Sequence, residues 1–322
     1  MGIRPPQLII AISNSAIYSN KNSNTSLIDL SKQNPELMTP RTSLKPGLNK
    51  AVNEKHFILR LLSLLFFTLI TFSVFSQKTM EVGIFGGVSY YLGDLNPGMH
   101  FKNPKIGYGV VARFNIDSRW AVKFNVFRGK VKGSSQSTTF LPERNLSFES
   151  PVTDISATAE FNFLKYFTGS RRDFISPYIY TGISAFFYDP VANGYSLRSL
   201  GTEGQNIGYE GRNPYSSVSV AIPFGLGVKI SLAKNLGMTI FWEMHKTFTD
   251  YLDDVSQTYY LNSQDINPDD PAAYLSDPSL DHQPGMERGD PKNKDWYSFA
   301  GLTVTYKFTL HGRGKCRDNK KF

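Results

Sequence analysis

An acid, an imidazole and a hydroxyl stand at alternate positions in one short segment and are the residues best suited to chemistry. Glu243, His245 and Thr247 are spaced two apart, so in a β-strand their side chains share one face. Such a set can activate a nucleophile for lipid hydrolysis. Nothing else in the sequence marks a hydroxyl for activation. We therefore expect no catalytic residues, and a lipid-modifying enzyme is the weaker alternative.

Eight charged residues, Glu243 among them, lie at positions whose side chains point away from the apolar face of their own segment. If these positions line an enclosed interior, four acids meet four bases. Pairing is then expected, because an isolated buried charge is costly. We predict a structural network of ion pairs that fills the interior, and a conducting pore is the alternative. The eight residues are Glu81, Arg113, Lys123, Asp154, Glu160, Lys229, Glu243 and Lys307.

The most acidic part of the chain is residues 250–295, which hold eleven Asp or Glu and three Lys or Arg. It includes the pairs Asp253-Asp254 and Asp269-Asp270. We interpret this segment as a solvated surface loop. A Ca²⁺ or Mg²⁺ site that bridges to lipopolysaccharide is the alternative. No spacing matches the oxygen ligands of an EF-hand loop, so we predict no metal site and no cofactor.

Strict alternation of apolar and polar residues runs through the chain after residue 77 and predicts β-strands. In Ser217–Leu232 every even position is apolar and every odd position is small or polar. No segment of this region has a convincing helical period. The eight predicted strands are Met80–Leu92, Gly107–Ile116, Trp120–Lys130, Asp154–Phe163, Pro177–Tyr188, Ser217–Leu232, Leu236–Thr249 and Ala300–Phe308.

The connections between the predicted strands alternate in length. Residues 117–119, 164–176 and 233–235 are short or moderate connections, whereas those at the opposite end are long. Long strands with one apolar face suit a lipid band, and hydrocarbon forbids open sheet edges. The predicted fold is all-β: an eight-stranded antiparallel up-and-down transmembrane β-barrel in a Gram-negative outer membrane, with both termini in the periplasm. A secreted β-sandwich is the alternative.

Outward-facing cations and aromatic residues lie where the predicted wall meets the membrane surfaces. Arg128, Lys130 and Lys246 stand near the outer ends of strands, within reach of lipid A phosphates. We name them as candidate lipopolysaccharide contacts, and snorkelling to solvent is the alternative. Aromatic residues suit two girdles: Trp120, Tyr306 and Phe308 at the inner boundary, and Tyr90, Tyr108, Tyr188 and Trp296 at the outer one.

Composition narrows the class of protein. The formal net charge of +8 divides into +5 for residues 1–76 and +3 for residues 77–322, with no basic stripe for nucleic acid. We therefore expect no nucleic-acid partner. Hydrophobic residues are 40% of the chain, too many for a disordered protein. A single cysteine, Cys316, rules out an internal disulfide framework and a cysteine-based zinc site.

Residues 55–76 have the layout of a signal peptide, with a basic lead, the apolar run Leu61–Phe75 and modest residues before a cut at Gln77. The run of 15 residues is shorter than the roughly 20 that a membrane-spanning helix, the alternative, requires. Residues 1–54 are rich in Asn and Ser. We interpret them as a disordered extension from a mis-assigned start, and a genuine disordered leader is the alternative. The barrel is then residues 77–308.

A basic tail, residues 309–322, follows the last predicted strand and contains five Lys or Arg around Cys316. We predict that it lies in the periplasm. Cys316 and Arg317 are candidate contacts with a partner protein, and a frayed end is the alternative.

A series of motifs, in order along the barrel, resembles one known family. The chain is similar to the small outer-membrane barrels called PorG, of the DUF6089 family of Bacteroidetes. Each motif is short, and the specificity lies in the series. The motifs are EVGIFGGVSYYLGD at 81–94, IDSRW at 116–120, SPYIYTG at 176–182, IPFGLG at 222–227, TDYLDDVSQTY at 249–259 and DWYSFAGLTVTYKF at 295–308.

The resemblance implies an eight-stranded barrel without enzymatic activity, an accessory component of type IX protein secretion. It also implies attachment to a periplasmic ring formed by a lipoprotein and its partner, PorK and PorN. Because related barrels serve other roles, the fold is expected to carry over better than the function. A structural or adhesive barrel of the OmpA type is the alternative. The extension at residues 1–54 departs from the family pattern.

Overall fold

The computed structural model describes residues 79–137 and 141–309 of the 322-residue chain. The predicted extension at 1–54, the signal peptide at 55–76 and the tail beyond residue 309 lie outside the described residues, and so do Cys316 and Arg317.

Eight long strands form the wall of the described structure, and they coincide with the eight strands that alternation predicts. Their bounds are β1 (Thr79–Leu92), β2 (Lys105–Asn115), β3 (Trp120–Ser134), β4 (Ser147–Asn162), β5 (Ile175–Tyr188), β8 (Val218–Ala233), β9 (Leu236–Thr247) and β10 (Trp296–Thr309).

The wall is a closed antiparallel barrel. Each strand pairs with its neighbour along the chain, and β1 also pairs with β10 over the whole of its length. The order around the wall is therefore β1-β2-β3-β4-β5-β8-β9-β10 and back to β1. Because every wall strand has two partners, its backbone donors and acceptors are used within the wall and no edge is left open. The predicted fold class, an eight-stranded antiparallel up-and-down barrel, is confirmed.

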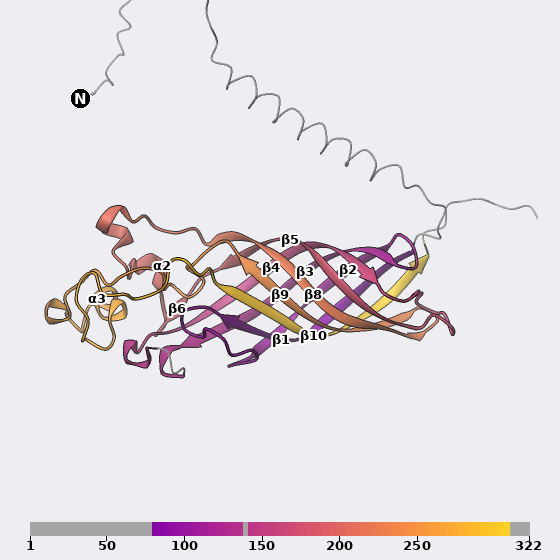
Figure 1. Ribbon diagram of the computed structural model, residues 1–322, viewed down its shortest axis with the longest axis horizontal. Coiled ribbons are helices and arrows are strands. Elements are labelled where there is room, and N and C mark those ends of the chain that lie inside the picture. The colour runs from indigo at the N-terminus through magenta and orange to yellow at the C-terminus, as the bar shows by residue number, and fades with distance from the viewer. Residues whose placement is uncertain (1–78, 138–140, 310–322) are drawn as a thin grey trace, which may run out of the picture. The chain divides into compact units, whose positions relative to one another are not determined.

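The two ends of the barrel differ, as Figure 1 shows. At the turn end, residues 116–119, 163–174 and 234–235 connect the strands. At the cap end, long segments form a folded cap over the barrel. The cap contains β6 (Val191–Ala192), β7 (Tyr195–Ser196), α2 (Leu197–Leu200), α3 (Pro271–Ser276) and the 3₁₀ helices Ser135–Ser137, Pro142–Arg144, Gln205–Ile207, Tyr209–Gly211 and Ser263–Asp265.

Three wall strands reach at least four residues further toward the cap than the sequence predicts. β3 continues to Ser134, β4 begins at Ser147 and β10 begins at Trp296. In β3 the inward positions stay buried, while Lys130 and Lys132 point outward. Residues 131–134 and 147–153, at the two ends of the predicted connection 131–153, are therefore strand. Beyond the apolar part of the wall the outward residues of these strands are polar. The alternation of apolar and polar residues therefore ends before the strand does, and the prediction stops too early.

The outward face of the wall is apolar around the whole circumference. Every wall strand carries exposed apolar side chains, among them Ile84 with 67% of its surface exposed, Ile183 with 72% and Leu226 with 54%. Inward side chains are buried, as the alternating burial of β4 and β5 shows. The apolar side of each strand thus faces outward, the reverse of a β-sandwich.

No helix within the described residues is long and apolar enough to cross a membrane.

Two of the aromatic residues predicted for the outer girdle, Tyr90 and Tyr188, are buried, and a third, Trp296, is half-buried. Tyr188 is buried because its position in β5 points inward. Tyr90 is outward by alternation but fully buried, since the segment between β1 and β2 folds back over the outside of the wall. Tyr108 and Trp120 are exposed, as are Tyr306 and Phe308 at the turn end.

Candidate functional site

The lumen near the turn end holds a compact ion-pair network. Arg113 donates from Nε to Glu160 Oε2 at 2.7 Å and from Nη1 to Glu81 Oε2 at 2.9 Å. Lys229 Nζ lies 2.6 Å from Glu160 Oε2 and 4.7 Å from the ring centre of Tyr178. All four charged side chains are at most 2% exposed. Two acids therefore meet two bases, and the charges balance without solvent.

A second network lies closer to the cap end and joins four strands. Lys123 Nζ is 3.2 Å from Glu243 Oε2, and Glu243 Oε1 is 2.8 Å from His245 Nε2. His245 Nδ1 lies 3.5 Å from Asp154 Oδ2, which accepts a hydrogen bond from the Tyr297 hydroxyl at 2.7 Å. Two carboxylates face one lysine, so this network is neutral when His245 also carries a positive charge.

Lys307 does not join either network. Its side chain is half-buried at the turn end, where Nζ donates to the backbone oxygen of Thr168. The lumen thus brings together seven of the eight predicted residues. Lys307 stands opposite Glu81 in the β1–β10 register, but its Nζ is directed to Thr168 and not to the carboxylate.

Aromatic side chains fill the lumen between and around the charges. The rings of Phe85 and Phe127 lie 4.4 Å apart, and Phe85 also contacts Phe241 and Phe299. Small residues on β8 make room for rings from β5: a Cβ added at Gly225 would lie 2.6 Å from the Tyr180 hydroxyl oxygen. The small face that the sequence shows in Ser217–Leu232 is therefore a packing requirement of the filled lumen.

The predicted acid, histidine and hydroxyl do not form one catalytic unit. The Thr247 hydroxyl donates to the backbone oxygens of Thr249 and Asp295 and not to His245. A different hydroxyl, Ser184 Oγ, lies 3.4 Å from His245 Nδ1. Sequence reasoning missed Ser184 because it stands on β5, across the lumen. His245 has no exposed surface and Ser184 only 5%, so this arrangement leaves a substrate no access.

Asp154, Glu243 and His245 also form the one set of three potential metal ligands found among the described residues, with ligand atoms within 4.8 Å of one another. Asp154 Oδ2, both oxygens of Glu243 and both ring nitrogens of His245 already pair with each other, with Lys123 and with Tyr297, whereas Asp154 Oδ1 has no hydrogen-bond partner. A cation there would face the lysine and would require His245 to lose its role as a donor. The donor set therefore suits an ion-pair network better than a metal centre.

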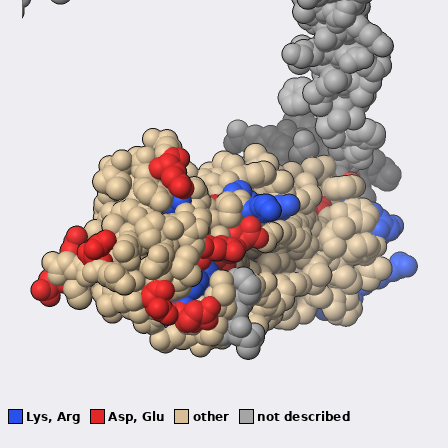
Figure 2. All heavy atoms as spheres, turned by 60° about the vertical axis from the view of Figure 1, so that its left-hand side comes forward, with Lys and Arg blue, Asp and Glu red and all other residues tan. Residues whose placement is uncertain are grey.

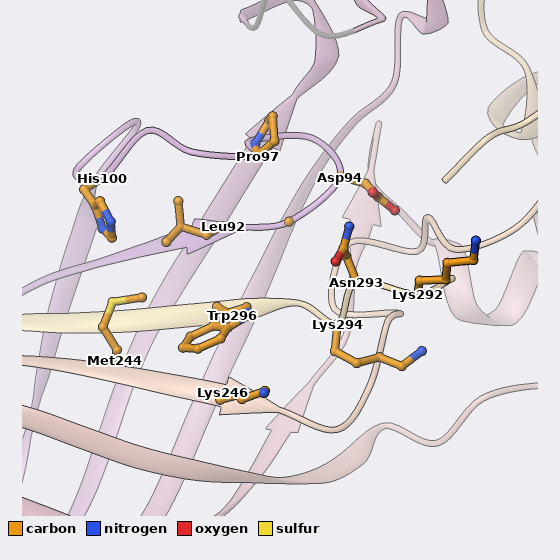
Figure 3. Close-up of a pocket in the computed structure, with 11 residues that line it drawn as sticks. Leu92, Asp94, Pro97, His100, Met244, Lys246, Lys292, Asn293, Lys294 and Trp296 are labelled. Carbon is orange, nitrogen blue, oxygen red and sulfur yellow. The ribbon is translucent and has the colours of Figure 1, made fainter. Parts of the chain in front are cut away.

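The predicted lipopolysaccharide contacts all lie on the outer face toward the cap end. Arg128 and Lys130 are exposed on β3, and Lys130 Nζ pairs with Glu149 at 2.8 Å. Lys246 is exposed on β9, and its Nζ lies 5.8 Å from the ring centre of Trp296. Of the three, Lys246 alone borders a groove, which is about 660 Å³ in volume (Figure 3).

The acidic segment 250–295 is part of a folded cap, and acids such as Asp254 are buried in it. The interpretation of this segment as a solvated loop is therefore wrong for these acids. Arg288 is buried and donates to Glu203 Oε1 at 3.1 Å, and it lies 3.6 Å from Asp254 Oδ2. Glu203 Oε1 also accepts from the backbone of Ser256 and Gln257. These contacts fasten the segment 189–217 to 250–295. The sequence held no signal for them, because neither segment has a regular period.

Four aspartates of the cap lie close together around the top of the lumen. Burial and the neighbouring carboxylates raise the pKa of Asp94 to about 7 and of Asp250 to about 6. For the same reasons the pKa values of Asp253 and Asp295 rise well above their usual range. In Figure 2 the acidic side chains visible on this face gather at the cap end. The cap therefore holds more negative charge than it can stabilise when all its acids are ionised.

Replacing Arg113 by Met is expected to destabilise the barrel strongly, because Glu81 loses its partner and Glu160 keeps only Lys229. Breaking a buried pair typically costs about 3–5 kcal/mol. Urea unfolding of the refolded barrel in micelles measures the loss. The exposed Arg128→Met variant is the matched control. Adding Glu81→Gln to Arg113→Met should recover much of the stability. Equal stabilities for Arg113→Met and Arg128→Met would contradict the network.

The cap is expected to be more stable at acidic than at alkaline pH. Acids whose pKa is higher in the folded than in the unfolded state, near 3.9, stabilise the fold below the unfolded pKa. That contribution is lost as the pH rises through about 6 to 7. Hydrogen-exchange protection of residues 250–295, corrected for intrinsic rates, should fall between pH 5 and pH 8.

The Asp94→Asn variant tests the same point, since Asn still accepts the Asp290 N–H that Oδ2 of Asp94 accepts at 3.1 Å. It should lose part of the pH dependence, whereas the exposed Asp265→Asn control should not. Cap protection that stays constant or increases toward pH 8 would show that these carboxyls do not govern cap stability.

Three solved structures share the barrel fold at low identity, each aligned over 72% of this chain. The attachment invasion locus protein Ail of Yersinia pestis, in complex with sucrose octasulfate, is 11% identical over 97% of its length, with a TM-score of 0.34. Neisserial surface protein A is 10% identical over 98%, with a TM-score of 0.36. The outer membrane protein OprG of Pseudomonas aeruginosa is 12% identical over 95%, with a TM-score of 0.32.

No curated protein matches the chain. A family model matches residues 59–316, which is most of the sequence and includes the whole described barrel. The chain therefore belongs to the family described as domain of unknown function DUF6089.

Proposed function

We propose that the chain is a non-enzymatic outer-membrane β-barrel that serves as an accessory component of type IX protein secretion. The observation that carries the membrane location is the closed wall, apolar on its outward face in every strand. The strands have 11 to 16 residues, and a tilted membrane-spanning strand needs roughly 9–11. Family membership and the series of motifs that resembles PorG support the secretion role.

The filled lumen supports a structural role over transport or catalysis. The charges of the two networks are paired and at most 3% exposed, and aromatic rings pack between them. A water-filled pore would leave such side chains accessible to solvent. An enzyme would need an opening to His245 and Ser184. The barrel acts instead as a rigid support whose two ends are available to other molecules.

The two ends suit two different tasks. The folded cap faces the exterior, and the turn end faces the periplasm together with both chain termini. There the turns and the basic tail with Cys316 and Arg317 contact the ring of the PorK and PorN type. Outer-membrane lipid, including lipopolysaccharide, surrounds the wall. This orientation follows the usual arrangement of short periplasmic turns and long outer loops.

The membrane location predicts a dependence on depth when arginine replaces an outward isoleucine. Ile183, in the middle of β5, and Ile106, at the cap end of β2, are both strongly exposed. Ile183→Arg should destabilise the barrel in lipid vesicles by about 2–4 kcal/mol and Ile106→Arg by about 0–1. Equal costs, or tolerance of both changes in a water-soluble monomer, would argue for a soluble barrel.

The secretion role predicts that deleting the gene removes proteins with the type IX C-terminal sorting domain from the culture medium. Mass spectrometry of the medium measures their loss. Complementation with the full chain should restore secretion, and a chain ending at Thr309 should restore membrane insertion without recovering the ring proteins from detergent extracts.

Two outcomes would redirect the functional proposal. If secretion is unchanged after deletion, a structural or adhesive barrel of the OmpA type becomes the leading function. If a His245→Ala variant that folds normally loses a modification of lipid A, the barrel is a lipid-modifying enzyme. A scaffold would keep the lipid A pattern of the parent strain.

A further inference from the structure

The segment between β1 and β2 lies against the outside of the wall. His100 Nδ1 is 3.1 Å from the Tyr90 hydroxyl, and the rings of Phe101 and Tyr90 are 4.8 Å apart. Trp242 of β9 donates from Nε1 to the same hydroxyl at 2.7 Å. These contacts cross the outer face from β1 to β9, and they explain why Tyr90 is fully buried.

This segment has a fixed shape. The Asn96 amide donates to the backbone oxygens of Tyr91 at 2.7 Å and Met99 at 2.9 Å. Gly93 and Asn96 are joined by a backbone bridge. Residues 93–104 therefore form a preorganised flap beside the wall, and the groove of about 660 Å³ lies at its base.

The groove is amphiphilic. Its apolar surface is made by Leu92, Met244 and Trp296, the ends of three wall strands. Lys246 lies beside Trp296, its partner in the β9–β10 register, and Lys292 and Lys294 stand further toward the cap on the segment that leads into β10 (Figure 3). The groove thus offers cations directly beside an apolar surface at the edge of the exposed apolar wall.

The residues that line the groove carry more positive than negative charge. Asp94 lines it, and the Oδ2 atom of this residue accepts a hydrogen bond from Asp290 N. Lys294 Nζ lies 3.7 Å from Asp250 Oδ2 and donates to a backbone oxygen at 2.9 Å. Lys246 is held near Trp296, with Nζ 5.8 Å from the ring centre. Among the residues that line the groove, three lysines therefore stand with one carboxylate, that of Asp94.

We propose that the groove binds the phosphate-bearing headgroup of an outer-leaflet lipid of the lipid A class. Its phosphate lies among Lys246, Lys292 and Lys294, and an acyl chain follows Leu92 and Met244 down onto the wall. Charge complementarity selects the phosphate. The position of the groove at the edge of the apolar wall selects a lipid over a soluble anion. This assignment rests on the proposed membrane location but not on the secretion role.

Native mass spectrometry of the refolded full-length mature chain in detergent, titrated with bisphosphorylated lipid A, tests the proposal. The groove variant Lys246→Gln/Lys292→Gln/Lys294→Gln should bind lipid A at least about tenfold more weakly, because each lysine near an anionic surface contributes appreciably to binding. The control Lys165→Gln/Arg171→Gln/Arg172→Gln removes the same charge from exposed residues at the turn end. It should bind within about twofold of the parent.

Measurements with two further ligands distinguish the phosphate of a lipid from free phosphate. Dephosphorylated lipid A should bind at least about tenfold more weakly than the bisphosphorylated form. Millimolar inorganic phosphate should fail to displace bound lipid A. Displacement by inorganic phosphate would show a simple anion site. Equal losses in the two triple variants would show diffuse attraction to the positive charge of the protein. Either result, or no retention of lipid A, overturns the proposal.

The outcome is separable from the membrane proposal. A parent chain that inserts into vesicles and shows the expected difference between Ile183→Arg and Ile106→Arg, yet retains no lipid A, overturns the groove assignment alone. Heat-dependent migration on gels confirms that both triple variants form the closed barrel before binding is measured.

Discussion

Closure of the wall is the constraint on which the rest of the structure depends. A sheet whose outward face is apolar in every strand has no place in water, and in hydrocarbon an open edge would leave backbone groups without partners. Pairing of β1 with β10 along their full length removes that edge. Closure also separates an interior from an exterior. Because successive side chains of a strand point to opposite faces, each side chain lies in one of two very different surroundings.

The interior of so narrow a barrel has room for side chains and little else. Charges placed there must pair with one another, and the lumen contains two networks of opposite charges. Rings and glycines then share the remaining space, as Gly225 does with Tyr180. A lumen built in this way stiffens the wall. It also explains why an acid, a histidine and a serine can meet at His245 without offering a reaction site.

The strands and the direction of their faces could be predicted, because alternation is a local property of the sequence. The pairing of Glu81 with Arg113 is nearly as local, since the two stand opposite each other in adjacent strands. Lys123 and Glu243 meet across the lumen from non-adjacent strands, which depends on the stagger of the whole barrel. The cap could not be predicted, because Glu203 and Arg288 lie 85 residues apart in segments without a period.

The cap and the wall differ in where their charged residues lie, and the groove lies at the boundary between them. Along the apolar part of the wall the outward residues are apolar, and the charges of the two lumen networks are buried and paired. In the cap, buried aspartates crowd together and gain stability by taking up protons. The apolar outer face of the wall ends at Trp296 and Lys246, and there cations lie directly beside apolar side chains. That succession matches the order of chemistry in a phosphorylated lipid, acyl chain first and phosphate above it, which is why we place a lipid there and not in the lumen.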